Sequence, residues 1–273
     1  MEIAREAAPE IDRLVLSVNR GVGPKHGGRL LELARECGLE TLELLPHFGD
    51  FLRAGKLTRD LATLRMRYMP PGRVLSRLDE LEGKLLIRRS DSGLVATPAL
   101  QPLLEARSAA EADVATEMWA DHHDDVTTVT PLARRLVEAA SDDHVVAVVH
   151  RTLPEPADPY LLLLVRLVTL RYIRQHDHAM AWHSHGLTAP EMVTMTELWH
   201  DQFGDESGHG LTRLVAAGLA EADPPRLTSA GHEMREAIEG ETNRRSQETF
   251  DVLDPGAGEA LIAALRRLPG TTD

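Results

Sequence analysis

Histidines and arginines recur along residues 159–186, an apolar-rich stretch that is typical of one long helix. They are Arg171, Arg174, His176, His178, His183 and His185. A metal cluster is one interpretation, but His176 and His183 share a face at a separation of two turns, about 10.5 Å. Because zinc needs ligand bonds of about 2 Å, no two of the four histidines can hold one ion on an unbroken helix. A metal would require His200, His209 or another chain, and we predict no metal site.

Arg171, Arg174 and His178 follow one another at i, i+3 and i+7, which places them on one helical face. Such a face can bind an anionic small molecule, and His178 could change its charge near neutral pH. The alternative is that the three side chains only pair with nearby carboxylates such as Asp177 or Glu197. A histidine here could also serve as a general base, which leaves an enzyme open without indicating a reaction.

Other enzyme signatures are missing from the sequence, which has no nucleophile elbow, Walker loop, dinucleotide fingerprint or zinc-protease helix. The glycine-rich segment at 21–28 lacks the Lys-Ser/Thr ending of a phosphate loop, so we expect a turn between helices. We interpret the polar segment 122–125 as a loop near a domain boundary. No catalytic residue and no cofactor are predicted.

The composition sets the class of protein. Of the 273 residues, 42% are hydrophobic and only 4% aromatic, which favours a mainly α protein with a core of Leu, Val and Ala. The single cysteine, Cys37, excludes an internal disulfide and fits a reducing compartment, so we expect a cytoplasmic protein. The longest apolar run, 161–165, is far shorter than the ~20 residues that cross a bilayer, and no membrane contact is expected.

The net charge of −13 argues against nucleic acid at first sight, but the charge is unevenly distributed. Residues 52–107 carry 11 basic and 6 acidic side chains, a net charge of +5, whereas residues 108–273 carry 13 and 28. The alternative is a chance clustering of solvated charges. A basic segment inside an acidic protein nevertheless marks a candidate nucleic-acid interface.

The basic segment has the order of elements of a winged helix-turn-helix. Thr58 can cap a short helix to about Arg67, and Pro70-Pro71 ends it and begins another. Along the second helix, one stripe is predicted to be buried, and Gly83 marks its end; the stripe is Val74, Leu78, Leu81 and Leu85. Two strand-like runs around the turn at 90–93 predict a hairpin wing. Thr97 and Pro98 are expected to start the next helix.

The second helix leaves Arg73, Ser76 and Arg77 facing outward with Glu80, and the first strand carries Arg88 and Arg89. This segment resembles the MarR-like winged helix family at 78–87, Arg88, Arg89, Thr97 and Pro98, with Leu85 where that family usually has glycine. The resemblance implies that Arg73, Ser76 and Arg77 read the major groove and that Arg88 and Arg89 contact phosphate from the wing. The alternative is a winged helix used only for protein contacts.

A second copy of the pattern follows at an offset of 133 residues, aligning 81–87 with 214–220. The segment 227–231 then resembles the end of a hairpin that is two residues shorter. The residues equivalent to the first copy's four arginines and one serine include no arginine or lysine; they are Glu206, His209, Gly210, Glu221 and Ala222. Because acidic groups repel phosphate, we expect this copy to dimerise or to sense a ligand rather than to bind DNA.

The C-terminal half also resembles actinobacterial tandem winged-helix proteins called SalK-like, through Arg171, Arg174, His178 and the pair Gly186-Leu187. That resemblance implies an architecture rather than an activity.

The sequence thus predicts a mainly α fold of tandem winged helix-turn-helix modules with small β-hairpin wings and long connecting helices. We expect four segments: an N-terminal helical segment at 1–51, the basic winged helix at 52–110, a helical connector at 111–158, and a C-terminal module with the altered winged helix at 159–273.

The predicted function is a DNA-binding transcriptional regulator that binds duplex DNA as a homodimer and responds to a small-molecule effector. The alternative is a small-molecule-binding or catalytic protein that uses tandem winged helices as a scaffold.

Overall fold

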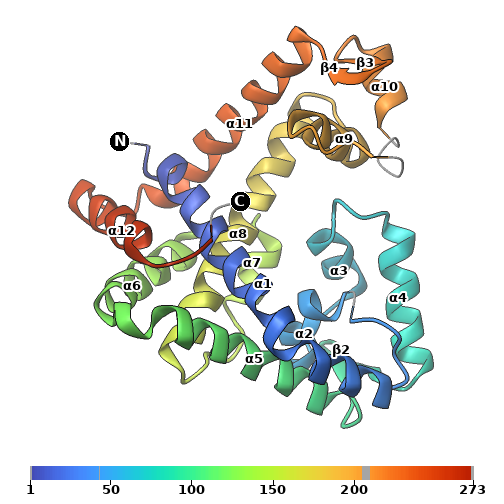
Figure 1. Ribbon diagram of the computed structural model, residues 1–273, viewed down its shortest axis with the longest axis vertical. Coiled ribbons are helices and arrows are strands. Elements are labelled where there is room, and N and C mark those ends of the chain that lie inside the picture. The colour runs from blue at the N-terminus through green and yellow to red at the C-terminus, as the bar shows by residue number, and fades with distance from the viewer. Residues whose placement is uncertain (1, 43, 205–209, 272–273) are drawn as a thin grey trace.

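The structure is a computed structural model that describes residues 2–42, 44–204 and 210–271. It confirms the mainly α fold with two small antiparallel hairpins. Long helices form a central body, with a winged-helix module at the lower right and another at the top (Figure 1). The helices of the body are α1 (Ile3–Glu36), α5 (Gln101–Trp119), the 3-10 turn η1 (Ala120–His122), α6 (His123–Ala139), α7 (Val145–His150), α8 (Pro159–Ser184) and α12 (Pro255–Arg267). No described helix is long and apolar enough to cross a membrane.

The first winged helix contains α2 (Leu45–Arg53), α3 (Arg59–Arg65), α4 (Pro71–Gly83), β1 (Ile87–Ser90) and β2 (Gly93–Ala96). The hairpin pairs Ile87 with Ala96 and Ser90 with Gly93. A bridge from Leu57 to Leu94 adds a minimal third strand. Gly93 has φ 141°, and a Cβ there would lie 2.7 Å from the Leu57 carbonyl oxygen, so this close approach requires glycine.

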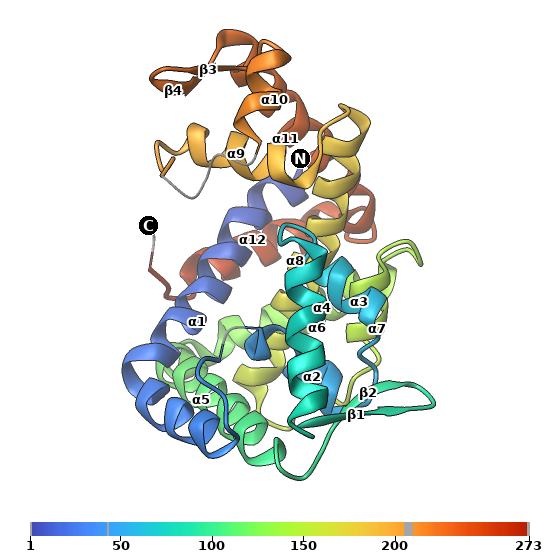
Figure 2. The same cartoon turned by 90° about the vertical axis from the view of Figure 1, so that its right-hand side faces the viewer.

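The second winged helix contains α9 (Ala189–Trp199), α10 (Leu211–Ala216), β3 (Ala220–Ala222), β4 (Pro225–Leu227) and α11 (Ser229–Phe250). It has its own buried core, whereas the first winged helix shares a core with the helical body. Two helices join the cores, because α8 and α11 pack along each other and contribute to both. Figure 2 shows the second module at the top and the first at the bottom, with α8 passing between them.

The internal repeat is confirmed by equivalent backbone contacts. In the first copy, the Thr97 hydroxyl donates to the Leu85 carbonyl at 2.8 Å and the Thr97 N–H donates to Leu86 at 2.9 Å. In the second copy, the Thr228 hydroxyl donates to Gly218 at 2.8 Å and the Thr228 N–H donates to Leu219 at 3.1 Å. The same residue type therefore closes the base of both hairpins.

Two expectations about helix ends are wrong. Helix α5 begins at Gln101 rather than near Thr97, because Thr97 uses its hydroxyl and N–H to close the hairpin. Leu85 is not part of the buried stripe of α4. The helix ends at Gly83, and Leu85 is 77% exposed with φ 57°, while Val74, Leu78 and Leu81 are buried as predicted.

Two segments expected to be irregular are mostly helical. Residues 21–28 lie inside α1, where buried Val22 and Leu30 anchor the helix and packing overrides the weak propensity of the glycines. The segment 122–125 ends the 3-10 turn η1 and starts α6. Asp124 and Asp125 occupy its first turn, where the helix dipole favours acidic side chains.

Candidate functional site

The N-terminal half of α4 presents exposed side chains on the surface of the first helix-turn-helix. Arg73 and Ser76 are exposed there as expected. Arg77 is not: its side chain is only 11% exposed, it pairs with Glu80, and it donates a hydrogen bond to the Thr41 carbonyl at 2.9 Å. The expectation that Arg77 faces outward is therefore wrong in this structure, because Arg77 ties α4 to the segment before α2.

The charge along α4 is polarised. Its acidic residues, Asp79, Glu80 and Glu82, all lie in the C-terminal half, and each pairs with a basic side chain. Arg59 of α3 reaches both Asp79 and Glu82. The first turns of α4 carry no acidic side chain, and the helix dipole favours negative charge at this end. The N-terminal end of α4 is thus the end of the helix whose charge suits an anionic partner.

The wing carries exposed guanidinium groups. Arg88 and Arg89 are successive residues of β1 and are both exposed, so they point to opposite faces of the hairpin. Arg89 is 76% exposed and its Nε lies 3.0 Å from Glu82 Oε1. Within the described part of the chain, Arg88 has no carboxylate partner.

The second winged helix differs at the equivalent positions. Glu206 and His209 lie outside the described residues. Gly210, the equivalent of Arg77, is so close to α9 that a Cβ would lie 2.5 Å from the Pro190 carbonyl oxygen. In the hairpin, Glu221 pairs with Arg226 at 2.6 Å, and Ala222 is exposed. Because Glu221 and Arg226 pair with each other, this hairpin carries less positive charge than the wing of the first module.

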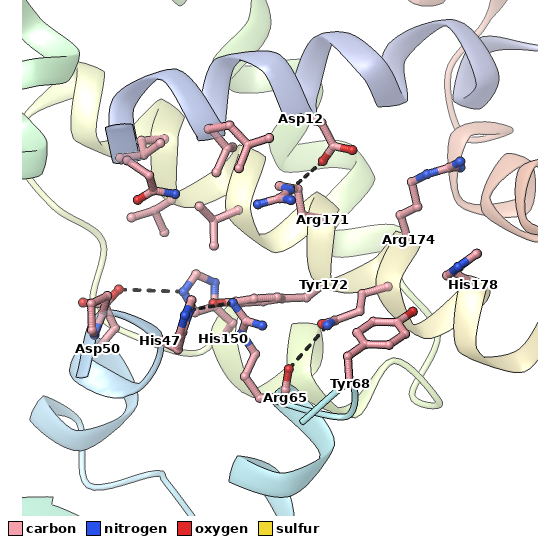
Figure 3. A pocket seen from close by; sticks show the side chains of 18 of the residues that line it. Asp12, His47, Asp50, Arg65, Tyr68, His150, Arg171, Tyr172, Arg174 and His178 are labelled. Atoms are coloured by element: carbon pink, nitrogen blue, oxygen red, sulfur yellow. Dashed lines mark hydrogen bonds and ion pairs between the residues drawn. The ribbon is translucent and has the colours of Figure 1, made fainter. Parts of the chain in front are cut away.

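A cavity of about 890 Å³ lies among the first winged helix, the body and α11. Its wall combines side chains from α1, α2, α3, α5, α8 and α11, and Figure 3 shows Asp12, Arg65 and Arg171 turned toward it from three of these helices. This volume is typical of sites for drug-sized ligands. The cavity joins segments that are distant in sequence.

Arg171, Arg174 and His178 all line this cavity, and each has a polar partner. Arg171 Nε donates to Asp12 Oδ1 at 2.6 Å. Arg174 donates to Asn243 Oδ1 and to Glu239 Oε2, both at 2.9 Å. The face predicted from the sequence is therefore a cavity wall whose arginines are oriented by carboxylates from α1 and α11.

His178 is held as a neutral ring. Its Nδ1 lies 3.1 Å from the Thr242 hydroxyl, which itself donates to the Ile238 carbonyl. The hydroxyl oxygen must accept, so Nδ1 carries a proton, and in the neutral ring Nε2 is then unprotonated. Burial lowers the pKa of His178 to about 4; the charge of Glu239 opposes this shift, and Arg235 and Arg174 act in the same direction as burial. The expectation that His178 titrates near neutral pH is therefore wrong.

Neither of the carboxylates expected to pair with this face does so among the described contacts. Asp177 is buried on another side of α8, where Ser246 donates to it at 2.8 Å and His144 Nε2 lies 3.0 Å away. Glu197 lies on α9. The actual partners, Asp12 and Glu239, are 159 and 65 residues away in sequence.

Most residues of the cavity wall were not predicted from the sequence. The missed polar and aromatic residues include His47, Arg65, Tyr68, Tyr172, Arg235 and Glu239. The Arg65 guanidinium lies 4.3 Å from the centre of the Tyr172 ring, a cation–π contact. Tyr68 packs against both His178 and Trp182. The one available signal was that Arg65 and Tyr68 lie at the end of the predicted first helix of the helix-turn-helix.

The described residues form no group of three metal-ligating side chains. The histidines of α8 have other contacts: His176 packs on His144, and His183 packs on Trp182. The cavity wall is suited to bind charged groups and aromatic rings.

Comparison with protein families gives one match, a helix-turn-helix family over residues 85–271. This match covers most of the chain, so the protein belongs to that helix-turn-helix family. The match indicates a DNA-binding regulator in general. No curated protein matches the chain, and no solved structure does.

Proposed function

We propose that the protein is a transcriptional regulator that binds duplex DNA as a homodimer and changes its DNA affinity when a small molecule occupies the cavity. The observation that carries the DNA half is the exposed, acid-free N-terminal end of α4, together with two exposed arginines on the wing that follows the C-terminal end of the same helix. It lies in the only segment of the sequence with a clear positive charge.

In this proposal α4 enters the major groove and the wing follows the backbone. Arg73 and Ser76 meet base edges or phosphates, and Arg88 and Arg89 contact phosphate. Arg77 can join them only if its contacts with Glu80 and Thr41 open. A guanidinium can hold a guanine edge or a phosphate with two hydrogen bonds. A homodimer would place two such helices one DNA turn apart on a palindromic site.

The ligand half rests on where the cavity lies. Arg171, Arg174 and His178 line it from α8, while Arg65 and Tyr68 line it from the helix-turn-helix itself. Arg65 is the last residue of α3, and Tyr68 lies in the turn to α4. A ligand that contacts both walls favours one orientation of α4 over others, and this differential affinity is what regulation requires.

The test of DNA binding is a mobility-shift assay with the DNA that flanks the protein's own gene. We expect tight binding by the parent protein and at least tenfold weaker binding by the variant with Arg73→Ala and Arg88→Ala. The matched control is Arg226→Ala in the second hairpin, which should bind as the parent does. Absence of binding to any duplex at low salt would refute the regulator.

The test of ligand sensing is a thermal-shift screen of candidate effectors. An effector that uses the α8 face should raise the melting temperature of the parent but not of His178→Ala. An unchanged shift in that variant would exclude the face as the site.

One observation favours the alternative, a catalytic or binding protein on a winged-helix scaffold. The unprotonated Nε2 of His178 beside a large polar cavity is a group that could accept a proton. This alternative predicts a chemical change in a cavity ligand and no DNA binding.

A further inference from the structure

Arg65 differs from the other arginines of the cavity wall. Four of them pair with a wall carboxylate; they are Arg107 with Glu111, Arg171 with Asp12, and Arg174 and Arg235 with Glu239. Arg65 has no carboxylate partner among the residues with described positions. Its Nε is buried and makes no hydrogen bond there. The wall thus holds one guanidinium whose charge is not neutralised by its neighbours.

The polar neighbour of Arg65 cannot supply a negative charge. Its NH2 group lies 3.4 Å from His47 Nδ1. Because a guanidinium only donates, this ring nitrogen accepts and the ring is neutral. Burial, together with the positive charges of Arg65, Arg107 and Arg171, lowers the pKa of His47 to about 4. His47 therefore lies within the positive field of three arginines from α3, α5 and α8.

Part of the cavity wall is apolar. The aliphatic residues of the wall come from α1 and α8 and are Val15, Leu16, Leu164, Val165 and Val168. Phe51 and Tyr172 pack together beside them, with ring centres 6.3 Å apart. A ligand that fits this wall combines an apolar body with a charged end.

We propose that the cavity binds an amphipathic oxyanion, a carboxylate or phosphate carried by an apolar body, with the anionic group held by Arg65 beside His47 and the body lying against Tyr172 and the aliphatic wall. Planar guanidinium groups match both oxyanions in a bidentate geometry. Arg65 is half-buried and has no carboxylate partner in the described part of the wall, so an anion would supply the opposite charge that this guanidinium lacks.

This inference deepens the ligand-sensing part of the proposed function and rests on it. Because Arg65 ends α3, the anion would bind directly to the helix-turn-helix. Arg235 and Glu239 on the facing wall belong to α11, which continues from the second module. Bound as proposed, the molecule would connect α3 of the first module to α1 and α8 of the body, in the cavity that α11 also borders.

Isothermal titration calorimetry at pH 7.5 and low chloride tests the proposal with four probes: phenyl phosphate, phenylacetate, inorganic phosphate and benzyl alcohol. We expect at least one of the two phenyl anions to bind, and the tighter of them identifies the oxyanion. Inorganic phosphate and the neutral alcohol should each bind at least tenfold more weakly. Equal affinity for either of these would refute the amphipathic ligand.

The variants locate the site. Arg65→Met keeps a long apolar side chain on Tyr172 but removes the charge, and it should weaken phenyl-anion binding at least tenfold. Arg65→Lys keeps a charge and should lose less. The control is Arg134→Met, because Arg134 is an exposed arginine of α6 paired with Glu138. Melting curves verify that each variant is folded.

Two results would overturn the inference: none of the probes binds the folded parent protein, or Arg65→Met binds the phenyl anion as the parent does. The failure of the DNA-binding proposal is distinguishable from both, because the mobility-shift assay without ligand tests it separately. A protein that binds the phenyl anion and no DNA would refute the regulator and leave the anion site standing.

Discussion

Leu85 and Gly218 occupy the same place in the two copies of the winged helix, and both have a left-handed backbone, with φ of 57° and 74°. Each follows the C-cap of the helix before the hairpin, and each offers its carbonyl to the threonine that closes the hairpin. The position requires a conformation that glycine adopts without strain. The first copy holds it with leucine, whose side chain is 77% exposed.

The first prediction is therefore that Leu85→Gly stabilises the protein. Little buried surface is removed, and relief of the left-handed strain should raise the free energy of unfolding by about 1 kcal/mol. The matched variant is Gly218→Ala, which should cost about 1 kcal/mol although a Cβ there meets no atom within 4 Å. Urea unfolding measures both. A destabilised Leu85→Gly protein would show that the exposed side chain makes an interaction worth more than the strain.

The second prediction concerns the salt dependence of DNA binding. If Arg88 and Arg89 neutralise phosphates, the double alanine variant should make the negative slope of log K against log salt less steep. The change should be about 0.9 for each phosphate that is left without an arginine. It should also weaken binding similarly for all sequences, because phosphate contacts carry no base information. Arg226→Ala in the second hairpin should leave the slope unchanged. An unchanged slope in the wing variant would mean that the wing does not touch DNA.

The fold was largely predictable because its signals are local. The apolar spacing of Val74, Leu78 and Leu81 predicted α4, and the polar turn before Gly93 predicted the wing. The position of Leu85 outside the buried stripe was harder to predict from the sequence. The end of the helix and the left-handed backbone at Leu85 depend on how the hairpin packs against the helix. The continuous α1 was missed for a similar reason, since burial of Val22 and Leu30 outweighs the glycines between them.

The cavity could be predicted only from one side. The spacing of Arg171, Arg174 and His178 placed them on one face, but the partners that define the site come from other helices. Asp12 and Glu239 reach that face only through the packing of α1 and α11 on α8. Whether a charged side chain is neutralised depends on such long-range packing, which a helical pattern does not contain.

The third prediction is a loss of stability in mild acid. The pKa of His47 falls from 6.5 to about 4 on folding, so between these values the unfolded chain binds more protons than the folded one. The stabilisation is present above about pH 6.5 and is lost as the pH falls toward 4. For His47 alone, the free energy of unfolding should drop by about 1–2 kcal/mol between pH 7 and pH 5.

Urea unfolding at the two pH values measures this effect, and His47→Gln should show a correspondingly smaller drop. The pKa of His178 is lowered in the same direction, so the variant that carries both His47→Gln and His178→Gln should be less pH-dependent still. An equal drop in the parent and in the double variant would mean that other groups, such as the carboxylates, govern the acid sensitivity.

The fourth prediction joins the phenyl anion to the titration of His47. An anion at Arg65 would stabilise the protonated imidazole and raise the pKa of His47 from about 4. Saturation with the tighter phenyl anion should therefore move the His47 ring resonance to a higher midpoint in an NMR titration. His47→Gln assigns the signal. A midpoint that does not move while calorimetry reports binding would place the anion elsewhere in the cavity.

The last prediction concerns the two sides of α8. One side holds the buried residue Asp177, and the other side lines the cavity. Asp177 is 4% exposed and joins buried His144 and Ser246, so Asp177→Ala removes the carboxylate partner of the His144 Nε2 and of the Ser246 hydroxyl. The cost should be about 3 kcal/mol in the free energy of unfolding. The matched control is Asp142→Ala. The Asp142 side chain is 99% exposed, so this variant should change the free energy of unfolding by less than about 0.5 kcal/mol.

Because Asp177 lies away from the cavity, calorimetry well below the melting temperature should find phenyl-anion binding unchanged in Asp177→Ala. Loss of binding by the folded variant would mean that the buried cluster positions the cavity wall through α8, and that the two sides of this helix do not act independently.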